Sequence, residues 1–229
     1  MRRPSAAGRY ALLEAVRANI IKDFRIEFRR RFAVNVALSF AAITTLAVSL
    51  TAGGARLGAQ THALLFWIII FFSAMNGLSH VFTREEEEGT ALFLRITSPA
   101  EAVFTAKLVF NIAVIAVIVA AVTPLYVFFL DVEIASPGAF ALVACAGSLA
   151  IASSTTVLGA IVAKAGGRGS LFTIISFPVV LPPLWVAVKA SRSAIAGGAV
   201  SGDAVFLLAF SGALVAVSYM LFGHIWIEE

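Results

Sequence analysis

The chain has 229 residues, of which 60% are hydrophobic and 13% are charged, and its mean hydropathy is +0.97. An ordinary soluble domain carries about 25% charged residues, so this composition indicates an integral membrane protein with little chain left for a soluble domain. The net charge of +4 does not indicate nucleic-acid binding, because the basic residues are distributed as a membrane topology requires.

Residues 1–32 are predicted to form a cytoplasmic amphipathic segment. Apolar residues recur there at three- and four-residue steps, with charged residues between them, as in an amphipathic helix. We expect this helix to lie in the membrane plane, with its Lys and Arg side chains facing anionic head groups; a helix packed against a soluble partner is the alternative. A cleaved signal peptide is not expected, because the first apolar stretch starts only after Arg31 and has span length. The apolar stripe consists of Leu13, Val16, Ile20, Phe24 and Phe28.

Residues 33–229 contain six apolar windows that each supply the roughly 17 to 25 residues needed to cross the hydrocarbon core as a helix. The fold class predicted is therefore all-α, with six transmembrane helices. If both termini are cytoplasmic, the only Lys and Arg residues on the outer side of the membrane are Arg56, Lys189 and Arg192. This bias of basic residues toward the cytoplasm sets the orientation. The predicted spans are 33–51, 63–82, 102–130, 139–163, 170–188 and 204–227.

The predicted spans carry no acid or base at mid-depth, which argues against proton-coupled carriers and membrane hydrolases. Cys145 is the only cysteine, so an intramolecular disulfide and a cysteine metal cluster are both excluded. No metal site is predicted. His62, His80 and His224 lie near predicted membrane boundaries, where histidine is often a plain interfacial residue.

Four consecutive glutamates, Glu85 to Glu88, lie between the second and third predicted spans. In lipid each would cost about 2.5 to 3.5 kcal/mol, so all four are predicted to lie in water on the cytoplasmic side. Thr83 and Glu86 fit the capping box of a short helix, and Gly89 marks a weak point within it or just after it.

An apolar surface too short to span the membrane follows the glutamates, at Ala91, Leu92, Phe93, Leu94 and Ile96. Residues 98–101 fit a second capping box, where the third span begins. We predict a stiff cytoplasmic element that docks in a groove of a partner. The alternative is a solvated loop that only sets topology.

Two further patterns lie within the spans. Pro178, Pro182 and Pro183 should kink or break the fifth span, and they could mark a moving element, although a structural kink is the simpler interpretation. Small residues four apart could let a neighbouring helix approach closely, for ordinary packing within the chain or, alternatively, along a substrate path. This helix-packing row is Ala144, Ser148, Ala152, Thr156 and Ala160.

The order of these motifs resembles the coupling-helix region of ABC-2 type transporter permeases, and more specifically the CcmB family, the membrane subunit of the heme exporter of cytochrome c maturation. The resemblance rests on residues 84–90, Ser98-Pro99, Lys107, the charged stretch 22–29, and the glycine- and proline-containing stretch 167–182. It implies that the cytoplasmic element docks on a separate ATPase subunit. The docking residues implied are Arg84, Glu85, Glu86, Glu87, Glu88, Gly89, Leu92, Phe93 and Arg95.

The resemblance also implies CcmC, CcmD and the heme chaperone CcmE as partners besides the ATPase CcmA, a bacterial inner-membrane location, and heme as cargo. ATP would be hydrolysed by the partner, because the chain has no GxxxxGK[ST] phosphate loop. No cofactor is expected on this chain. The family's work is described either as heme export or as ATP-driven release of heme-loaded chaperone. A permease for a lipid-linked sugar or a drug, a non-moving scaffold and a membrane enzyme are the alternatives, and either a second copy or CcmC could complete the permease.

Overall fold

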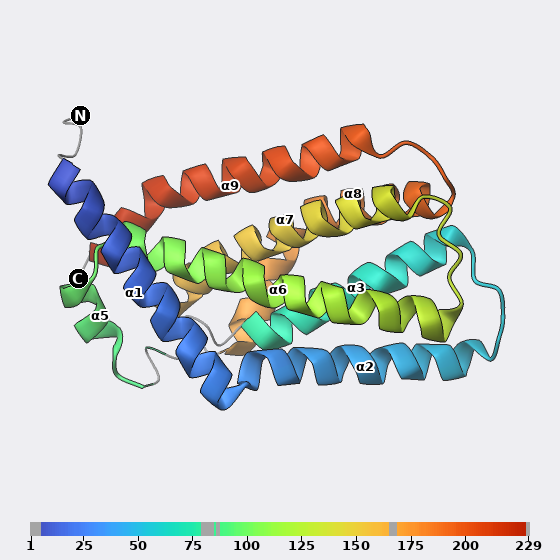
Figure 1. Cartoon of the computed structure of the whole chain (residues 1–229), viewed down its shortest axis with the longest axis horizontal. Helices are drawn as coiled ribbons and strands as arrows, with labels where there is room; N and C mark the ends of the chain where they lie inside the picture. The colour runs from blue at the N-terminus through green and yellow to red at the C-terminus, as the bar shows by residue number, and fades with distance from the viewer. Residues whose placement is uncertain (1–5, 79–84, 86–87, 165–168, 228–229) are drawn as a thin grey trace.

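The computed structural model describes residues 6–78, 85, 88–164 and 169–227, and its regular structure there is helical (Figure 1). Helix boundaries lie within a few residues of the predicted ones. The helices are α1 (Ala6–Arg30), α2 (Phe32–Ala52), α3 (Ala59–Leu78), α5 (Ala91–Thr97), α6 (Ala100–Leu130), α7 (Pro137–Lys164), α8 (Gly169–Ile195) and α9 (Ser201–Ile227).

Six long helices run along the long axis of the molecule, whereas α1 crosses the bundle obliquely at one end (Figure 1). The short helix α5 and the end of α9 lie at that same end, which we call the α5 end. The loops that join α2 to α3, α6 to α7 and α8 to α9 lie at the opposite end. The bundle therefore has one end with extra helices and one end made of loops.

Five helices in the described part of the chain are long and apolar enough to cross a membrane: α2, α3, α6, α7 and α9. The sixth predicted span, at 170–188, falls within α8, which is a helix of 27 residues but is not among the five. The described side chains of α8 include Lys189 and Arg192 near its end, and these lower its hydropathy. The protein is a multi-span helical membrane protein, and a sixth span stays a prediction.

Helix α1 contacts the bundle through Asn19, Asp23 and Phe24, and Phe24 packs against Phe110 of α6. Asn19 and Asp23 are buried, whereas Leu13 and Phe28 of the stripe are mostly exposed. A stripe of exposed apolar side chains suits contact with lipid or with another protein. Placement of α1 in the membrane plane is compatible with this arrangement and stays a prediction.

The helix-packing row predicted on α7 is buried at all five positions: Ala144, Ser148, Ala152, Thr156 and Ala160. Helix α7 packs against α6, α8 and α9 and so occupies the middle of the bundle. Small side chains along one face let the neighbouring backbones approach closely. The burial of the row is compatible with close packing within the chain. Packing and a substrate path both stay predictions.

Helix α8 continues through Pro178, Pro182 and Pro183 from Gly169 to Ile195. The prolines therefore do not break the helix, and the predicted kink stays a prediction. Each proline still removes one backbone hydrogen bond, but packing of α8 against α3 and α7 holds the helix together. A gating role for the prolines stays a prediction.

Gly147 of α7 lies against the indole of Trp67, which is fully buried in α3. The Trp67 indole donates a hydrogen bond to the Ser191 hydroxyl of α8, with a nitrogen to oxygen distance of 2.8 Å. A Cβ at position 147 would overlap the indole ring. Glycine at this position therefore leaves room for the Trp67 indole, through which α3 packs against α7 and α8.

Gly147→Ala is expected to lower the free energy of unfolding by about 1–3 kcal/mol, because the added methyl group overpacks a rigid contact. Gly138→Ala is the matched control in the same helix, since no heavy atom lies within 4 Å of a Cβ built there. Thermal unfolding of both purified variants measures the difference. Equal melting temperatures would show that the Trp67 contact is not tight.

Candidate functional site

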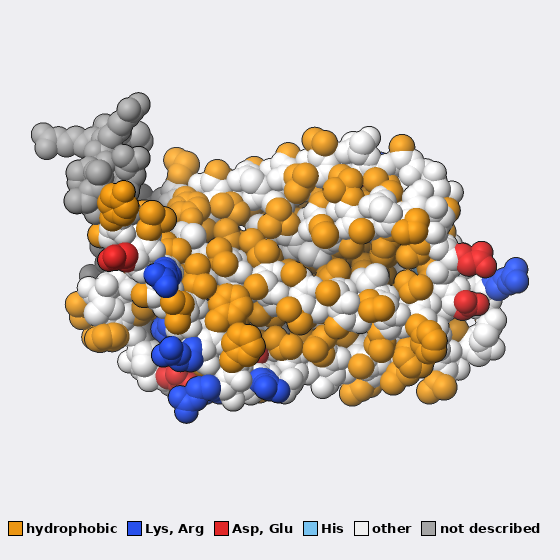
Figure 2. All heavy atoms as spheres, viewed as in Figure 1, with side chains coloured by type: hydrophobic (Ala, Val, Ile, Leu, Met, Phe, Trp, Pro, Cys, Tyr) orange, Lys and Arg blue, Asp and Glu red, His pale blue; other side chains and the backbone are white. Residues whose placement is uncertain are grey.

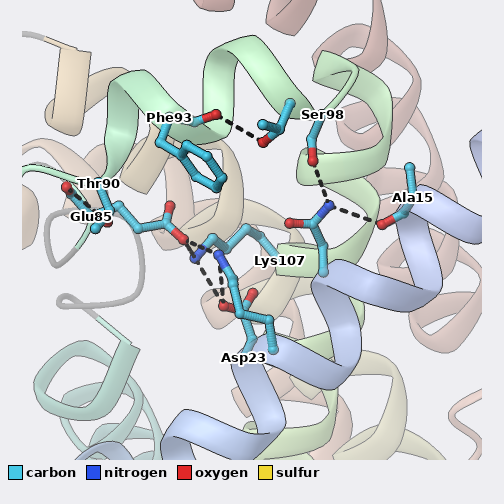
Figure 3. Close-up of polar contacts among 10 residues, drawn as sticks. Ala15, Asp23, Glu85, Thr90, Phe93, Ser98 and Lys107 are labelled. Carbon is cyan, nitrogen blue, oxygen red and sulfur yellow. Dashed lines mark hydrogen bonds and ion pairs between the residues drawn. The ribbon is translucent and has the colours of Figure 1, made fainter.

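Four charged side chains from three separate parts of the chain meet at the α5 end (Figure 3). The Lys107 ammonium of α6 lies 2.9 Å from Glu85 Oε1 and 3.4 Å from Asp23 Oδ1 of α1. Lys22 Nζ lies 2.5 Å from the same Glu85 oxygen and 3.5 Å from Asp23 Oδ1. We call Lys22, Asp23, Glu85 and Lys107 the ion cluster; its two ammonium groups and two carboxylates balance in charge.

Three of the four side chains in the ion cluster are buried. The side chains of Asp23 and Lys107 are 1% exposed and that of Glu85 is 8% exposed, whereas Lys22 is 34% exposed. Removing charges from water costs several kcal/mol per ion, and only a close partner offsets that cost. Each buried charge here has an opposite charge within 3.5 Å, so the four side chains are held as one unit.

Lys107 is near the start of α6, which has 31 residues. At 1.5 Å per residue this helix is about 46 Å long, whereas the hydrocarbon core is about 30 Å thick. Because α6 exceeds the membrane, its first turns can lie outside the hydrocarbon. The ion cluster thus joins the start of a membrane helix to α1 and to the loop that precedes it.

Glu85 is fixed from its backbone as well as from its side chain. The Thr90 N–H donates to the Glu85 carbonyl at 2.9 Å, and Gly89 between them has φ +68°. A bond from residue i+5 to residue i, with a left-handed residue before the donor, is the pattern that ends helices. Glycine adopts that conformation without strain, which agrees with the weak point predicted at Gly89.

The prediction that all four glutamates lie in water is wrong for Glu85. Burial would raise the pKa of Glu85, but the ammonium groups of Lys107 and Lys22 outweigh it and leave the pKa below its ordinary value. Glu85 is therefore ionised at neutral pH. Its contribution to stability is present above the ordinary pKa and is lost only as the pH falls toward the lowered value.

Glu88 differs from Glu85, because its pair with Arg30 of α1 at 2.5 Å is exposed. Ion pairs of this kind contribute about 0–1 kcal/mol, so Glu88 remains available to a partner. Of the other predicted docking residues in this run, Arg84, Glu86 and Glu87 lie outside the described residues. The acidic run therefore has one glutamate facing inward and at least one facing water.

Asn19 of α1 makes a second link to the α5 end. Its side-chain amide donates to the Ser98 hydroxyl at 3.1 Å and to the Ala15 carbonyl at 2.9 Å. The predicted capping box at 98–101 is not formed, because Pro99 occupies the cap position of α6 without a side-chain cap bond. The Ser98 hydroxyl contacts α1 instead, so α1 touches both the ion cluster and the end of α5.

Helix α5 presents an apolar surface outward. Leu92, Phe93 and Ile96 are 63%, 70% and 78% exposed, whereas Leu94 is buried. Arg95 is partly buried at the end of the helix. We call Leu92, Phe93 and Ile96 the α5 surface; it lies on the same loop as Glu85 and Glu88. Three adjoining exposed apolar side chains beside a charged rim are typical of a protein contact.

Of the three histidines in the sequence, only His62 has a side chain that the structure describes. His62 is buried in α3 near the opposite end, where it borders a cleft of about 360 Å³ and its carbonyl accepts a hydrogen bond from the Tyr126 hydroxyl at 3.1 Å. His80 and the side chain of His224 lie outside the described residues. Heme ligation by any of these histidines is an untested alternative to an interfacial role.

Sequence reasoning missed that Lys22, Asp23 and Lys107 belong with Glu85. In the sequence, Lys22 and Asp23 are two of the charged residues of the predicted amphipathic helix, and Lys107 lies near the start of the predicted span 102–130. One signal could have grouped them: a lysine seven residues inside an apolar helix needs a carboxylate partner, because an unpaired buried charge is too costly.

The comparison with protein families covers the whole of this site. The family model described as CcmB protein matches residues 14–225, which include every member of the ion cluster and all of α5. The chain belongs to the CcmB family. It is therefore a membrane permease component of the heme export system, as the order of its motifs had indicated. A search of curated proteins gave no match.

Proposed function

We propose that this CcmB chain is a driven permease subunit, in which the loop before α6 docks on a separate ATPase and passes its movement to the membrane helices. The work is mechanical and makes no bond. ATP hydrolysis belongs to a CcmA-like partner, and the cargo or released product is heme or heme-loaded chaperone.

The single observation that carries this proposal is the ion cluster. Glu85 lies in the same loop as the exposed α5 surface, and its carboxylate is bonded to Lys107 of α6 at 2.9 Å. A force applied at the α5 surface therefore reaches α6 through a short, rigid chain of atoms. Coupling between two sites needs an element that has two distinct arrangements. A buried charge network provides one well-defined arrangement, because separating its charges costs free energy.

Helix α1 joins the same path. Lys22 contacts Glu85 at 2.5 Å, and Asn19 contacts Ser98 at 3.1 Å, so α1 holds the loop at two places. A membrane-surface helix that is held in this way acts as a lever between the loop and the bundle. The proposed topology places the α5 end in the cytoplasm of a bacterium, with α8 as the sixth span of an inner-membrane protein.

A non-moving scaffold would also belong to an assembly complex, but it would not require a buried link between the docking loop and α6. An exporter of another substrate is disfavoured by the family. The subunits CcmC, CcmD and CcmE remain proposed partners, and the permease is proposed to be completed by a second copy of the chain or by CcmC.

Phe93→Ser is expected to weaken binding of the ATPase subunit by about 2 kcal/mol or more, which is roughly 30-fold, because aromatic side chains at the centre of an interface contribute most of the affinity. Co-purification of the ATPase with the tagged permease from membranes measures this, together with cytochrome c maturation in the same cells.

Phe128→Ser is the matched control, because Phe128 is 79% exposed but lies at the opposite end of α6. It should retain the ATPase. Loss of the ATPase from both variants would indicate general damage to the bundle, and retention in both with normal maturation would refute docking through α5.

A further inference from the structure

A groove of about 330 Å³ lies where α1, α2 and α6 meet. Its floor on α6 is formed by Phe110, Val114 and Val117, and Phe24 forms its wall on α1. Phe110 and Val114 are buried, whereas Val117 is 48% exposed. The volume is near the lower end of the range of about 300–1,000 Å³ typical of ligand pockets. Because α2 and α6 are candidate spans, this groove opens toward lipid.

The rim of the groove carries one arginine. Arg31 lies between α1 and α2 with φ 50°, and its side chain is exposed. Glu27 also lines the groove, where its Oε1 accepts a hydrogen bond from the Val34 N–H at 3.0 Å. Among the residues that the structure describes, no carboxylate lies within ion-pair distance of Arg31. The guanidinium is therefore available to an anion.

We propose that this groove binds one anionic phospholipid, with an acyl chain against the α6 floor and the phosphate at Arg31. Figure 2 shows basic side chains gathered at the α5 end beside the apolar side chains of the membrane-facing surface. An acyl chain has no polar groups to satisfy, whereas an extended peptide would leave its backbone polar groups unpaired against this apolar wall. The arginine supplies the preference for negative charge.

The lipid site adjoins the ion cluster. The rings of Phe24 and Phe110 pack edge to face with centroids 5.3 Å apart and separate the two. Phe24 follows Asp23 directly, and Phe110 lies about one turn after Lys107. A lipid in the groove would press α1 against α6 at the point where the cluster joins them. This inference depends on the groove alone, and so it goes beyond the proposed function.

Native mass spectrometry of the full chain in detergent, titrated with phosphatidylglycerol or phosphatidylcholine, tests the proposal. We expect one phosphatidylglycerol to remain bound at concentrations where phosphatidylcholine does not. Arg31→Gln should weaken phosphatidylglycerol binding about fivefold, the effect of one basic residue near a lipid surface. Arg31→Lys should preserve binding, and Ala113→Phe, which fills the groove, should abolish it.

Arg29→Gln is the matched control, because Arg29 is exposed on the same helix and does not line the groove. It should change the affinity by less than about twofold, since an exposed charge that does not line the groove contributes little to binding there. Excess glycerol phosphate should not displace the lipid. Equal losses for Arg29→Gln and Arg31→Gln, or full binding by Ala113→Phe, would overturn the lipid site. Either result would leave the docking proposal unaffected, because no ATPase is present.

Discussion

Lys107→Met is expected to lower the free energy of unfolding by about 3–5 kcal/mol, the cost typical of removing one partner from a buried ion pair. Methionine has a similar length but no charge, so Asp23 and Glu85 would remain buried without the Lys107 ammonium. Cytochrome c maturation should be lost as well. The change is measured by heating the purified chain in detergent. Unfolding is monitored as the loss of a trypsin-resistant band of the native protein with rising temperature.

Lys189→Met is the control for this substitution. Lys189 pairs with Asp203 at 2.9 Å near the opposite end, but its side chain is 55% exposed. Exposed pairs contribute about 0–1 kcal/mol, so this variant should stay close to the native melting temperature. Glu85→Gln combined with Lys107→Met should be less unstable than the sum of the two single variants, because residues in one network couple by about 0.5–3 kcal/mol. Additive effects would mean that the two side chains do not interact.

Lys22→Gln is expected to uncouple ATP hydrolysis from cytochrome c maturation without unfolding the chain. Lys22 is about one third exposed, and Glu85 keeps Lys107 as its buried partner, so the loss of stability should be small. The loop would nevertheless lose the 2.5 Å contact of Glu85 with Lys22, which is its buried link to α1, whereas the exposed Glu88–Arg30 pair would remain. Movement of the loop would then be passed less completely to α1, so more ATP should be hydrolysed for each cytochrome that matures.

Arg25→Gln is the matched control for Lys22→Gln. Arg25 lies three residues further along α1 and is exposed, and the charge lost is the same. A general effect of surface charge on membrane binding would appear in both variants. Only a role in the ion cluster would distinguish them.

The helices could be predicted from the sequence because long apolar windows are a strong signal. The six predicted windows fall within α2, α3, α6, α7, α8 and α9 where the structure describes them, since a helix is the economical way to bury backbone polar groups in lipid. The proline-containing window indicated a possible helix break that the structure does not contain. Prolines weaken a helix locally, but the neighbours α3 and α7, which sequence periodicity does not reveal, hold α8 together.

The candidate site was predicted in part. The acidic run, Gly89 and the apolar residues after it indicated a compact element between two spans, and α5 with its exposed Leu92, Phe93 and Ile96 lies there. Glu85 was predicted to lie in water because the free energy of a glutamate in water is far lower than in lipid. The protein interior is a third environment, where a lysine offsets the cost of burying the carboxylate.

The links to α1 could not be predicted, because they depend on how a helix is oriented against its neighbours. The apolar stripe predicted a helix in the membrane plane, but it did not indicate that Asn19 and Asp23 face the bundle. In a membrane protein the hydrophobic effect does not select which face meets protein, since lipid accepts apolar side chains equally well. Polar residues then mark the protein-facing side.

The most direct test of coupling through the ion cluster is the amount of ATP hydrolysed per cytochrome c matured, measured in reconstituted complexes of the native chain, Lys22→Gln and Arg25→Gln. We expect the ratio of ATP hydrolysed to cytochrome c matured to rise several-fold for Lys22→Gln and to stay unchanged for Arg25→Gln, with the ATPase bound equally in all three. A native ratio for Lys22→Gln, with its contact to Glu85 removed, would contradict this expectation.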